Sequence, residues 1–332
     1  MSDGEREGEV QLLSAGEPGF REPMLATLHE GPVTGDGWVF ELKLDGYRLI
    51  AVRDGDDVTL WTRNRQDRTG AFPEVAEALA AQPATRFVVD GEVVAFAGSA
   101  PSFSLLQRRA GITDPRMARS TNIEVSFYLF DLLHLNGVDV DRLPLSRRRQ
   151  LLEDAFHLDE PLRASPLLAG DSTELLDAAC RQGWEGLIAK RADAPYRHSR
   201  SREWLKLKCV RRQEMVIGGW TDPSGARNGF GSLLVGYHDD EGRLVFAGKV
   251  GTGYDEATLR DVSARLAPLA RATTPFQRES PRERGLHWVE PRLVAEIGFS
   301  EWTDTNRLRH PRFFGLRIDK DPADVVRERP GR

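Results

Sequence analysis

Residues 38–46 read WVFELKLDG, and they alternate between apolar and polar positions with the period of a half-buried strand. One face is apolar, whereas Glu41 and Lys43 share the other face, directly before a turn at Asp45-Gly46. A lysine at such a strand end has two interpretations. It lies on a solvated sheet face, or it is a nucleophile held by a rigid element.

Three other apolar segments carry charges in the same way. VVDGEVVAF, EGLIAKR and WLKLKC each place acids or lysines within or beside a strand-like run. Four such segments, bearing both signs of charge, predict a common polar cleft if the strands are neighbours. The residues expected to line it are Lys43, Glu92, Glu185, Lys206 and Lys208.

The chemistry that suits such a cleft is nucleotidyl transfer. A lysine amine attacks phosphorus only when it is neutral, and the ammonium groups of Lys206 and Lys208 are expected to lower the pKa of Lys43. The same two cations would neutralise charge that develops on a phosphoryl group. Glu92 and Glu185 supply the hard oxygen ligands that Mg²⁺ accepts beside substrate phosphates.

The bulk composition is that of an ordinary globular chain. Its 332 residues predict two domains, and 40% of them are hydrophobic and 29% charged. The sequence contains no apolar run of about 20 residues, so no membrane association is expected, and the acidic N-terminus is unlike a secretory signal. Cys180 and Cys209, far apart in sequence, predict neither a disulfide framework nor a zinc site and fit a reducing cytoplasm.

The net charge of −5 is unevenly distributed along the chain. Residues 1–20 are acidic and are expected to form a disordered lead-in. Two basic segments, 190–212 and 307–320, indicate binding of phosphate groups. A solvated basic face is the alternative interpretation for each of them.

Local patterns place these residues on a mixed α and β scaffold. The expected strands are 48–53, 57–63, 86–96, 124–133, 185–191 and 203–210. The expected helices are 73–82, with Pro73 in its first turn, and 146–156 and 172–183, both with serine caps. After residue 212, short strands separated by Gly, Asp and Asn turns surround one helix at 255–269, which is typical of a small OB-type barrel.

The motif Lys43-Leu44-Asp45-Gly46, followed by Arg48, resembles the KxDGxR nucleophile motif of ATP-dependent DNA ligases and of their relatives, the RNA ligases and mRNA capping enzymes. Further motifs of that family follow in order. They are Thr62-Arg63-Asn64, Asp90-Gly91-Glu92, the segment 127–131, Glu185-Gly186 with Lys190, the segment 204–208, and Arg317-Ile318-Asp319-Lys320. The phrases EPMLATL, EGLIAKR and LRHPRFFGLR are similar to the ligase module of bacterial Ku-linked end-joining enzymes and to their stand-alone paralogues.

The resemblance implies an α+β fold. An adenylation (nucleotidyltransferase) domain with antiparallel sheets and flanking helices would occupy 21–210, and an OB-fold β-barrel domain would occupy 211–332. In the family a glycine usually follows the Arg-Asn pair, whereas Arg65 follows Asn64 here. A turn that needs positive φ would be strained by arginine, so the backbone path near Arg63 stays open.

The resemblance also implies a role for each matching residue. Lys43 would form the AMP–lysine phosphoramidate. The other implied contacts are Glu41 beside the adenine, Phe130 stacked on it, Arg48 and Arg63 with ribose and phosphate, Glu92 with ribose and the metal shell, Glu185 with the metal, Lys206 and Lys208 with the α-phosphate, and Arg317 and Lys320 with the leaving pyrophosphate. Without the motif order, Phe130 would be assigned to core packing and Asp90 equally to a turn cap, while Lys190 stays undecided.

The predicted function is an ATP-dependent DNA ligase that uses Mg²⁺, with Mn²⁺ as the alternative metal. It would seal 5′-phosphate/3′-hydroxyl breaks through lysyl-AMP and DNA-adenylate, with nicked or broken duplex DNA as its partner, as a monomer in the bacterial cytoplasm at the nucleoid. Recruitment of Ku or of an end-joining polymerase stays open. The alternatives are an RNA ligase, a capping-type nucleotidyltransferase and a non-catalytic DNA-end-binding module.

Overall fold

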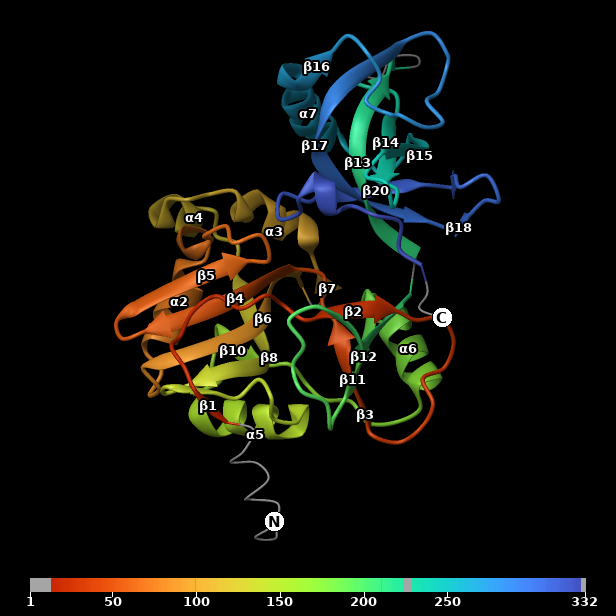
Figure 1. The fold of residues 1–332 in the computed structure, drawn as a ribbon. Coiled ribbons are helices and arrows are strands. Elements are labelled where there is room, and N and C mark those ends of the chain that lie inside the picture. Colours follow the sequence, from red (N-terminus) through yellow and green to blue (C-terminus); the bar gives the residue numbers. More distant parts are fainter. Residues whose placement is uncertain (1–12, 99, 210, 224–228, 330–332) are drawn as a thin grey trace. The chain divides into compact units, whose positions relative to one another are not determined.

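The computed structural model describes residues 13–98, 100–209, 211–223 and 229–329 (Figure 1). The chain divides between Cys209 and Val210 into two units, and each unit has its own sheets and core. Among the described residues, no helix combines the length and the apolarity that crossing a bilayer would require.

The larger sheet of the first unit is mainly antiparallel. In spatial order its strands are β1 (Ser14–Ala15), β9 (Val138–Asp139), β8 (Val125–Leu135), β6 (Arg86–Ala97), β4 (Tyr47–Asp54) and β5 (Asp57–Thr62). Two short strands lie off this path: β10 (Leu162–Ala164) pairs with β8 in parallel, and β7 (Ala100–Pro101) pairs with β6. The strands expected at 48–53, 57–63, 86–96 and 124–133 are therefore confirmed to within a few residues.

The second sheet of this unit contains four strands in the order β2 (Leu25–Leu28), β12 (Arg200–Lys208), β11 (Gly186–Arg191) and β3 (Trp38–Lys43). β11 pairs antiparallel with both of its neighbours. The predicted condition for a common cleft is thus met, because β3, β11 and β12, three of the four charged segments, lie side by side.

Helices cover the outer faces of both sheets (Figure 1). They are α2 (Pro73–Ala80), α3 (Phe103–Ala110), α4 (Pro115–Ser120), α5 (Leu145–Ala155) and α6 (Ser172–Arg181), with the 3₁₀ turn η1 (Thr69–Ala71) before α2. The three predicted helices are present, but both serine caps are wrong. Asp171 caps α6, and α5 follows Pro144 without a side-chain cap.

The short helices α3 and α4 were not expected from the sequence. Ser102 caps α3, and Asp114 caps α4 by accepting from the backbone N–H of Arg116. Arg109 of α3 is buried and donates to the carbonyls of Ala71 and Ile123. A buried arginine interrupts the apolar pattern from which a helix is predicted, because an arginine is normally assigned to the surface. Its partners for burial exist only in the folded chain.

The predicted disordered lead-in, 1–20, is wrong for its last part. Residues 1–12 lie outside the described residues. From Leu13 onwards the chain is ordered: β1 pairs with β9, and Phe20 packs beside Met24 and Trp204. Arg21 adds an ion pair of 3.1 Å with Asp139.

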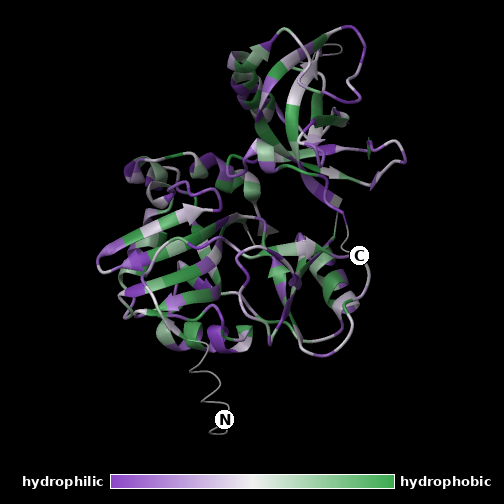
Figure 2. Cartoon of the chain, in the orientation of Figure 1, coloured by the Kyte–Doolittle hydropathy of each residue, from purple (hydrophilic) through white to green (hydrophobic). Residues whose placement is uncertain are grey.

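The four-stranded sheet separates its two faces by alternation. Phe40, Leu187, Leu205 and Leu207 pack together on one face, which α6 covers with Ala179. Figure 2 shows how hydrophobic stretches run along the strands of both units. The opposite face of this sheet receives the polar residues, as the alternation in residues 38–46 predicts.

The second unit is built on a sheet of five main strands. Their spatial order is β15 (Leu244–Val250), β14 (Leu233–His238), β13 (Arg211–Thr221), β17 (Leu286–Phe299) and β16 (Ala270–Arg271), with β20 (Arg312–Leu316) also paired to β17. The remaining elements are α7 (Glu256–Leu266), η2 (Ala267–Leu269), η3 (Pro322–Asp324) and the pair β18 (Glu301–Trp302) and β19 (Leu308–Arg309). The predicted run of short strands with one interposed helix is confirmed.

The prediction of two unpaired thiols is wrong. Cys180 at the end of α6 and Cys209 directly after β12 form a disulfide, with their Cα atoms 5.3 Å apart. The pairing follows from the packing of α6 on the four-stranded sheet, which the separation of 29 residues in sequence does not reveal.

Reduction of this disulfide should destabilise the first unit. A closed loop of 29 residues limits the unfolded chain, and the expected loss on reduction is about 3.5 kcal/mol of unfolding free energy. Urea unfolding with and without dithiothreitol measures it. Cys180→Ser should unfold identically under both conditions, and a wild-type protein that is equally indifferent to the reductant would contradict the pairing.

Candidate active site

The polar face of the four-stranded sheet begins with a row of three residues. Lys43 lies directly opposite Gly186, which in turn lies opposite Lys208. A Cβ on Gly186 would stand 1.9 Å from the carbonyl oxygen of Leu207, so only glycine fits between the strands there. The row therefore places one lysine on each side of Gly186, which has no side chain.

The next two rows of the sheet carry further charges on the same face. Glu41 lies opposite Ile188, which in turn lies opposite Lys206, and Lys190 lies opposite Trp204. The chain contains only six lysines. Four of them share this face: Lys43, Lys190, Lys206 and Lys208. Such a concentration of cations on one sheet face is suited to binding phosphate.

Lys43 forms an ion pair with Glu185, the residue that directly precedes β11. Burial by itself would lower the pKa of Lys43, and the charge of Lys208 also acts in that direction. The charge and hydrogen bond of Glu185, together with the charge of Asp45, outweigh both, so the pKa of Lys43 is raised in this structure. The expectation of a lowered pKa is wrong, although Lys208 has the predicted effect.

Lys190 and Glu41 form a buried ion pair of 2.7 Å beneath two aromatic rings. The Lys190 ammonium lies 4.4 Å from the ring centroid of Phe130 and 4.3 Å from that of Trp204. The two rings meet edge to face. Burial lowers the pKa of Lys190, and Glu41 opposes that change. Lys190 is thus a buried support for Glu41, and Phe130 is half-buried beside it.

Arg48 on β4 is clamped by Asp90 on β6. Its Nε and Nη2 atoms donate to the two carboxylate oxygens over 2.9 and 2.6 Å. The guanidinium also lies 5.4 Å from the Phe130 centroid and 5.5 Å from that of Trp204. Asp90 therefore orients an arginine, and the turn-cap interpretation is wrong for this residue.

The close packing of the turn after Lys43 leaves room only for glycine at position 46. A Cβ at Gly46 would stand 2.1 Å from the carbonyl oxygen of Val93 and 3.0 Å from Cγ of Glu92. The turn after Lys43 thus passes directly against β6, where Glu92 lies opposite Arg48 in the register. This contact joins the larger sheet to the end of β3 and places Glu92 next to the motif.

The turn after β5 contains the departure from the family pattern. Arg65 has φ of 54°, in the left-handed region that disfavours residues with a Cβ. Arg63, two residues earlier, is half-buried directly after β5. The Arg65 guanidinium lies 3.1 Å from Glu22 and 4.7 Å from the ring centroid of Phe20. The strain expected at this position is confirmed.

Arg317 and Lys320 lie in the second unit, each with acids of that unit. Arg317 donates to both carboxylate oxygens of Asp319 over 2.9 and 2.8 Å and to Glu296 over 3.1 Å. Lys320 pairs with Glu214 over 3.1 Å. Glu214 and Glu296 lie directly opposite on β13 and β17, so the two cations neutralise a like-charged pair.

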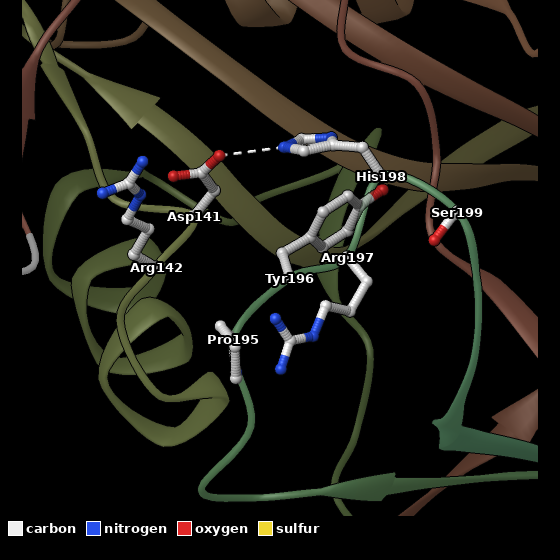
Figure 3. A pocket seen from close by; sticks show the side chains of 7 residues that line it. All are labelled: Asp141, Arg142, Pro195, Tyr196, Arg197, His198 and Ser199. Carbon is white, nitrogen blue, oxygen red and sulfur yellow. Dashed lines mark hydrogen bonds and ion pairs between the residues drawn. The ribbon is translucent and has the colours of Figure 1, made fainter.

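A pocket beside the larger sheet is lined by Asp141, Arg142 and residues 195–199 (Figure 3). In Figure 3 the His198 ring points toward the Asp141 carboxylate, 2.8 Å away. Its other nitrogen faces the carbonyl of Glu22 over 3.0 Å. The Asp141 hydrogen bond raises the pKa of His198. Burial would raise the pKa of Asp141, but the hydrogen bonds and charges of His198 and Arg142 together outweigh it, and the net shift is downward.

The sequence was compared with families of known proteins. The profile described as "ATP dependent DNA ligase domain" matches residues 23–208, and the one described as "ATP dependent DNA ligase C terminal region" matches residues 226–320. The chain belongs to the family of ATP-dependent DNA ligases. This family consists of covalent nucleotidyltransferases, and the lysine-rich sheet face lies within the first matched region.

Relatives of this ligase family cover nearly the whole chain. The multifunctional non-homologous end joining protein LigD of Pseudomonas aeruginosa is 41% identical over 94% of this chain and 37% of its own length. LigD of Mycobacterium bovis is 42% identical over 92% of this chain and 40% of its length. The chain thus spans about two fifths of the length of these curated relatives.

A solved ligase structure supports the fold. The structure titled "mycobacterial DNA ligase D complexed with ATP and MES" is 38% identical, has a TM-score of 0.66, and covers 93% of this chain and 98% of that chain. The predicted fold class is confirmed: an α+β nucleotidyltransferase domain with antiparallel sheets and flanking helices, followed by an OB-fold domain.

The supporting roles of Tyr196, Trp204 and Lys190 were not predicted from the sequence. Tyr196 lies in a loop without periodicity, and Trp204 was assigned only to a motif. The face of Lys190 could be read from its alternation with Ile188, but its partner Glu41 is on another strand. The structure gathers most of the predicted site residues around the joined sheets: Glu41, Lys43, Arg48, Glu92, Phe130, Glu185, Lys206 and Lys208. Arg63 lies directly after β5, and Arg317 and Lys320 belong to the second unit.

Arg65→Gly should be more stable than Arg65→Ala. Both variants lose the contacts with Glu22 and Phe20, so their difference isolates the backbone at φ of 54°. Relief of the left-handed strain, less the greater freedom of glycine in the unfolded chain, predicts a difference of about 1 kcal/mol. Urea unfolding of both variants measures it, and equal stability would refute the strain.

His198 should stabilise the fold most strongly in weak acid. Because the pKa of His198 is raised, its contribution to the unfolding free energy is complete below pH 6.5 and is lost as the pH rises through the pKa of the folded state. Because the pKa of Asp141 is lowered, its contribution is complete above pH 3.8 and is lost as the pH falls. The melting-temperature gap between wild type and His198→Gln should therefore be widest near pH 5 to 6. His29→Gln, whose ring faces the Pro32 carbonyl, is the control. A gap that widens above pH 8 would contradict the assignment.

Proposed function

We propose that this chain seals 5′-phosphate/3′-hydroxyl breaks in DNA with ATP, through a covalent AMP on Lys43. The single observation that carries the proposal is the row Lys43–Gly186–Lys208, with Glu185 beside it, in a chain of the ATP-dependent DNA ligase family. A lysine at the end of a rigid strand, next to a second cation, is the arrangement that phosphoramidate formation requires.

In the first step the Lys43 Nζ lone pair attacks the α-phosphorus of ATP. This requires that the Lys43 ammonium first gives up one proton to solvent. The bond between the α-phosphorus and the bridging oxygen breaks, pyrophosphate leaves with its electrons, and Nζ releases a second proton to solvent. Lys208 lies one strand beyond Gly186, and Lys206 follows in the next row. Both are assigned to the α-phosphate, where they would neutralise the charge that grows in the transition state.

The adenosine is assigned to the surface between the two sheets. Glu41 is held by Lys190 and would accept a hydrogen bond from the adenine, while Phe130 would stack on the ring. Arg48 and Arg63 are assigned to ribose and phosphate, and Glu92 to the ribose. The edge-to-face contact with Trp204 limits the motion of Phe130 and so prepares it for stacking.

The donor set fits a magnesium ion. The described residues hold no cluster of three or more His, Cys, Asp or Glu side chains arranged around a metal. Mg²⁺ needs only one or two carboxylates when it also binds substrate phosphates and water, and Glu185 and Glu92 supply them. When bound, Mg²⁺ (or Mn²⁺) would offset phosphate charge. At rest Lys43 is the cation beside Glu185.

In the second step a DNA 5′-phosphate oxygen attacks the AMP phosphorus and releases the Lys43 amine. In the third, a DNA 3′-hydroxyl attacks the 5′-phosphate and expels AMP. Arg317 and Lys320 of the second unit are assigned to the pyrophosphate of the first step. The basic segments 190–212 and 307–320 would contact the DNA backbone without reading its sequence.

The biological setting is inferred from relatives that are longer than this chain. Relatives named for non-homologous end joining support a role in DNA repair, on nicked or broken duplex DNA. Ku and an end-joining polymerase are the candidate partners. We assign the protein to the bacterial cytoplasm at the nucleoid, acting as a monomer.

Lys43→Ala should abolish the AMP adduct, because it removes the amine assigned to attack the α-phosphorus, while Lys208 lies on the other side of Gly186, on β12, and is assigned to the α-phosphate. The expected loss of adduct formation is a factor of about 10³ or more. Intact-protein mass spectrometry after incubation with ATP and Mg²⁺ measures it. Lys249→Ala removes a lysine of the second unit that pairs with Glu283 and should still acquire one AMP. An adduct on the Lys43→Ala protein would defeat the proposal.

A further inference from the structure

The Tyr196 hydroxyl lies at the centre of a buried hydrogen-bond network that the proposed chemistry does not use. It donates to Asp90 Oδ2 over 2.6 Å and accepts from the backbone N–H of Met24 over 2.8 Å. Arg48 Nη2 approaches the same oxygen at 3.4 Å. The tyrosine is only 4% exposed. All of the hydrogen-bonding capacity of its hydroxyl is therefore used inside the protein.

The network decides which nitrogen of Arg48 is left for a ligand. Nε and Nη2 are taken by Asp90, and Nη2 is also near the Tyr196 hydroxyl. Nη1 donates no hydrogen bond to any described residue. A carboxylate accepts from several donors at once, so the tyrosine hydroxyl can hold Asp90 in place while Asp90 holds the guanidinium.

The ring of Tyr196 is also fixed from the other side. It meets Trp204 edge to face with 5.8 Å between centroids, and its backbone N–H donates to the Asp141 carbonyl over 2.7 Å. Figure 3 shows Tyr196 with His198 and Asp141, the pair that anchors the same loop. Tyr196 thus connects the loop 195–199 to β6 and, through Trp204, to β12.

We propose that Tyr196 is a positioning residue for Arg48. Its hydroxyl fixes the Asp90 carboxylate, so that Arg48 presents Nη1 to the nucleotide phosphate or ribose. This inference rests on the proposed function, because it needs Arg48 to contact the nucleotide. A tyrosine that served packing alone would need only its ring.

Tyr196→Phe tests this directly, because it keeps the ring and removes the hydroxyl. An arginine contact that is equal in the bound state and the transition state affects the Michaelis constant and not the maximal rate. The ATP concentration for half-maximal lysyl-AMP formation should rise about tenfold, with the maximal rate within about twofold of wild type. Tyr237→Phe removes a tyrosine hydroxyl of the second unit that takes no part in this network and should leave both values unchanged.

A double-mutant cycle separates positioning from general stability. In an Arg48→Gln background, Tyr196→Phe should have no further effect on the half-maximal ATP concentration. Both changes interrupt the same chain of hydrogen bonds, which runs from the Tyr196 hydroxyl through Asp90 to Arg48. If circular dichroism shows that Tyr196→Phe does not fold, Asp90→Asn is the second variant. It interrupts the same chain of hydrogen bonds at the carboxylate and should give the same tenfold rise in the half-maximal ATP concentration.

Two results would overturn the inference. One is an unchanged half-maximal ATP concentration in a folded Tyr196→Phe or, where that variant does not fold, in Asp90→Asn. The other is a multiplicative effect in the Arg48→Gln background. Wild-type protein that acquires no AMP would instead refute the proposed function, so the two failures are distinguishable.

Discussion

The ion pair between Lys43 and Glu185 is the interaction on which the site depends. A half-buried amine needs a counterion to be stable, yet only the neutral amine can attack phosphorus. The structure shows the stable resting state, in which Glu185 keeps the proton on Lys43. Burial and Lys208 favour the neutral amine, whereas Glu185 and Asp45 oppose them, so withdrawal of Glu185 from Nζ would shift the balance toward the neutral amine.

Much of the site could be predicted because the alternation of side chains along a strand determines which residues lie on the same face of the sheet. The apolar set of residues 38–46 packs under α6, and the same alternation places Glu41 and Lys43 together on the other face. The motif order then assigned β11 and β12 to the same cleft, and their register with β3 agrees. Local chemistry also exposed the strained turn, since Arg65 stands where a positive φ is needed.

What could not be predicted depends on distances between distant segments. The sign of the Lys43 shift follows from which carboxylate lies nearest, and Coulomb energy depends on a separation that no motif contains. Cys180 and Cys209 meet only because α6 packs on its sheet. Tyr196 reaches Asp90 across 106 positions of sequence, from a loop without period. Buried arginines such as Arg109 look like surface residues until their carbonyl partners are known.

The carboxylates beside Arg317 and Lys320 affect how the second unit could bind a triphosphate. Both cations are already oriented by Glu214, Glu296 and Asp319. An arriving phosphate therefore exchanges one anionic neighbour for another, and its departure leaves no charge stranded in a poorly hydrated place. Binding in which a phosphate replaces a carboxylate partner of Arg317 or Lys320 is expected to be weak and quickly reversed. For the pyrophosphate contact proposed for Arg317 and Lys320, such exchange would suit release within each turnover better than tight affinity would.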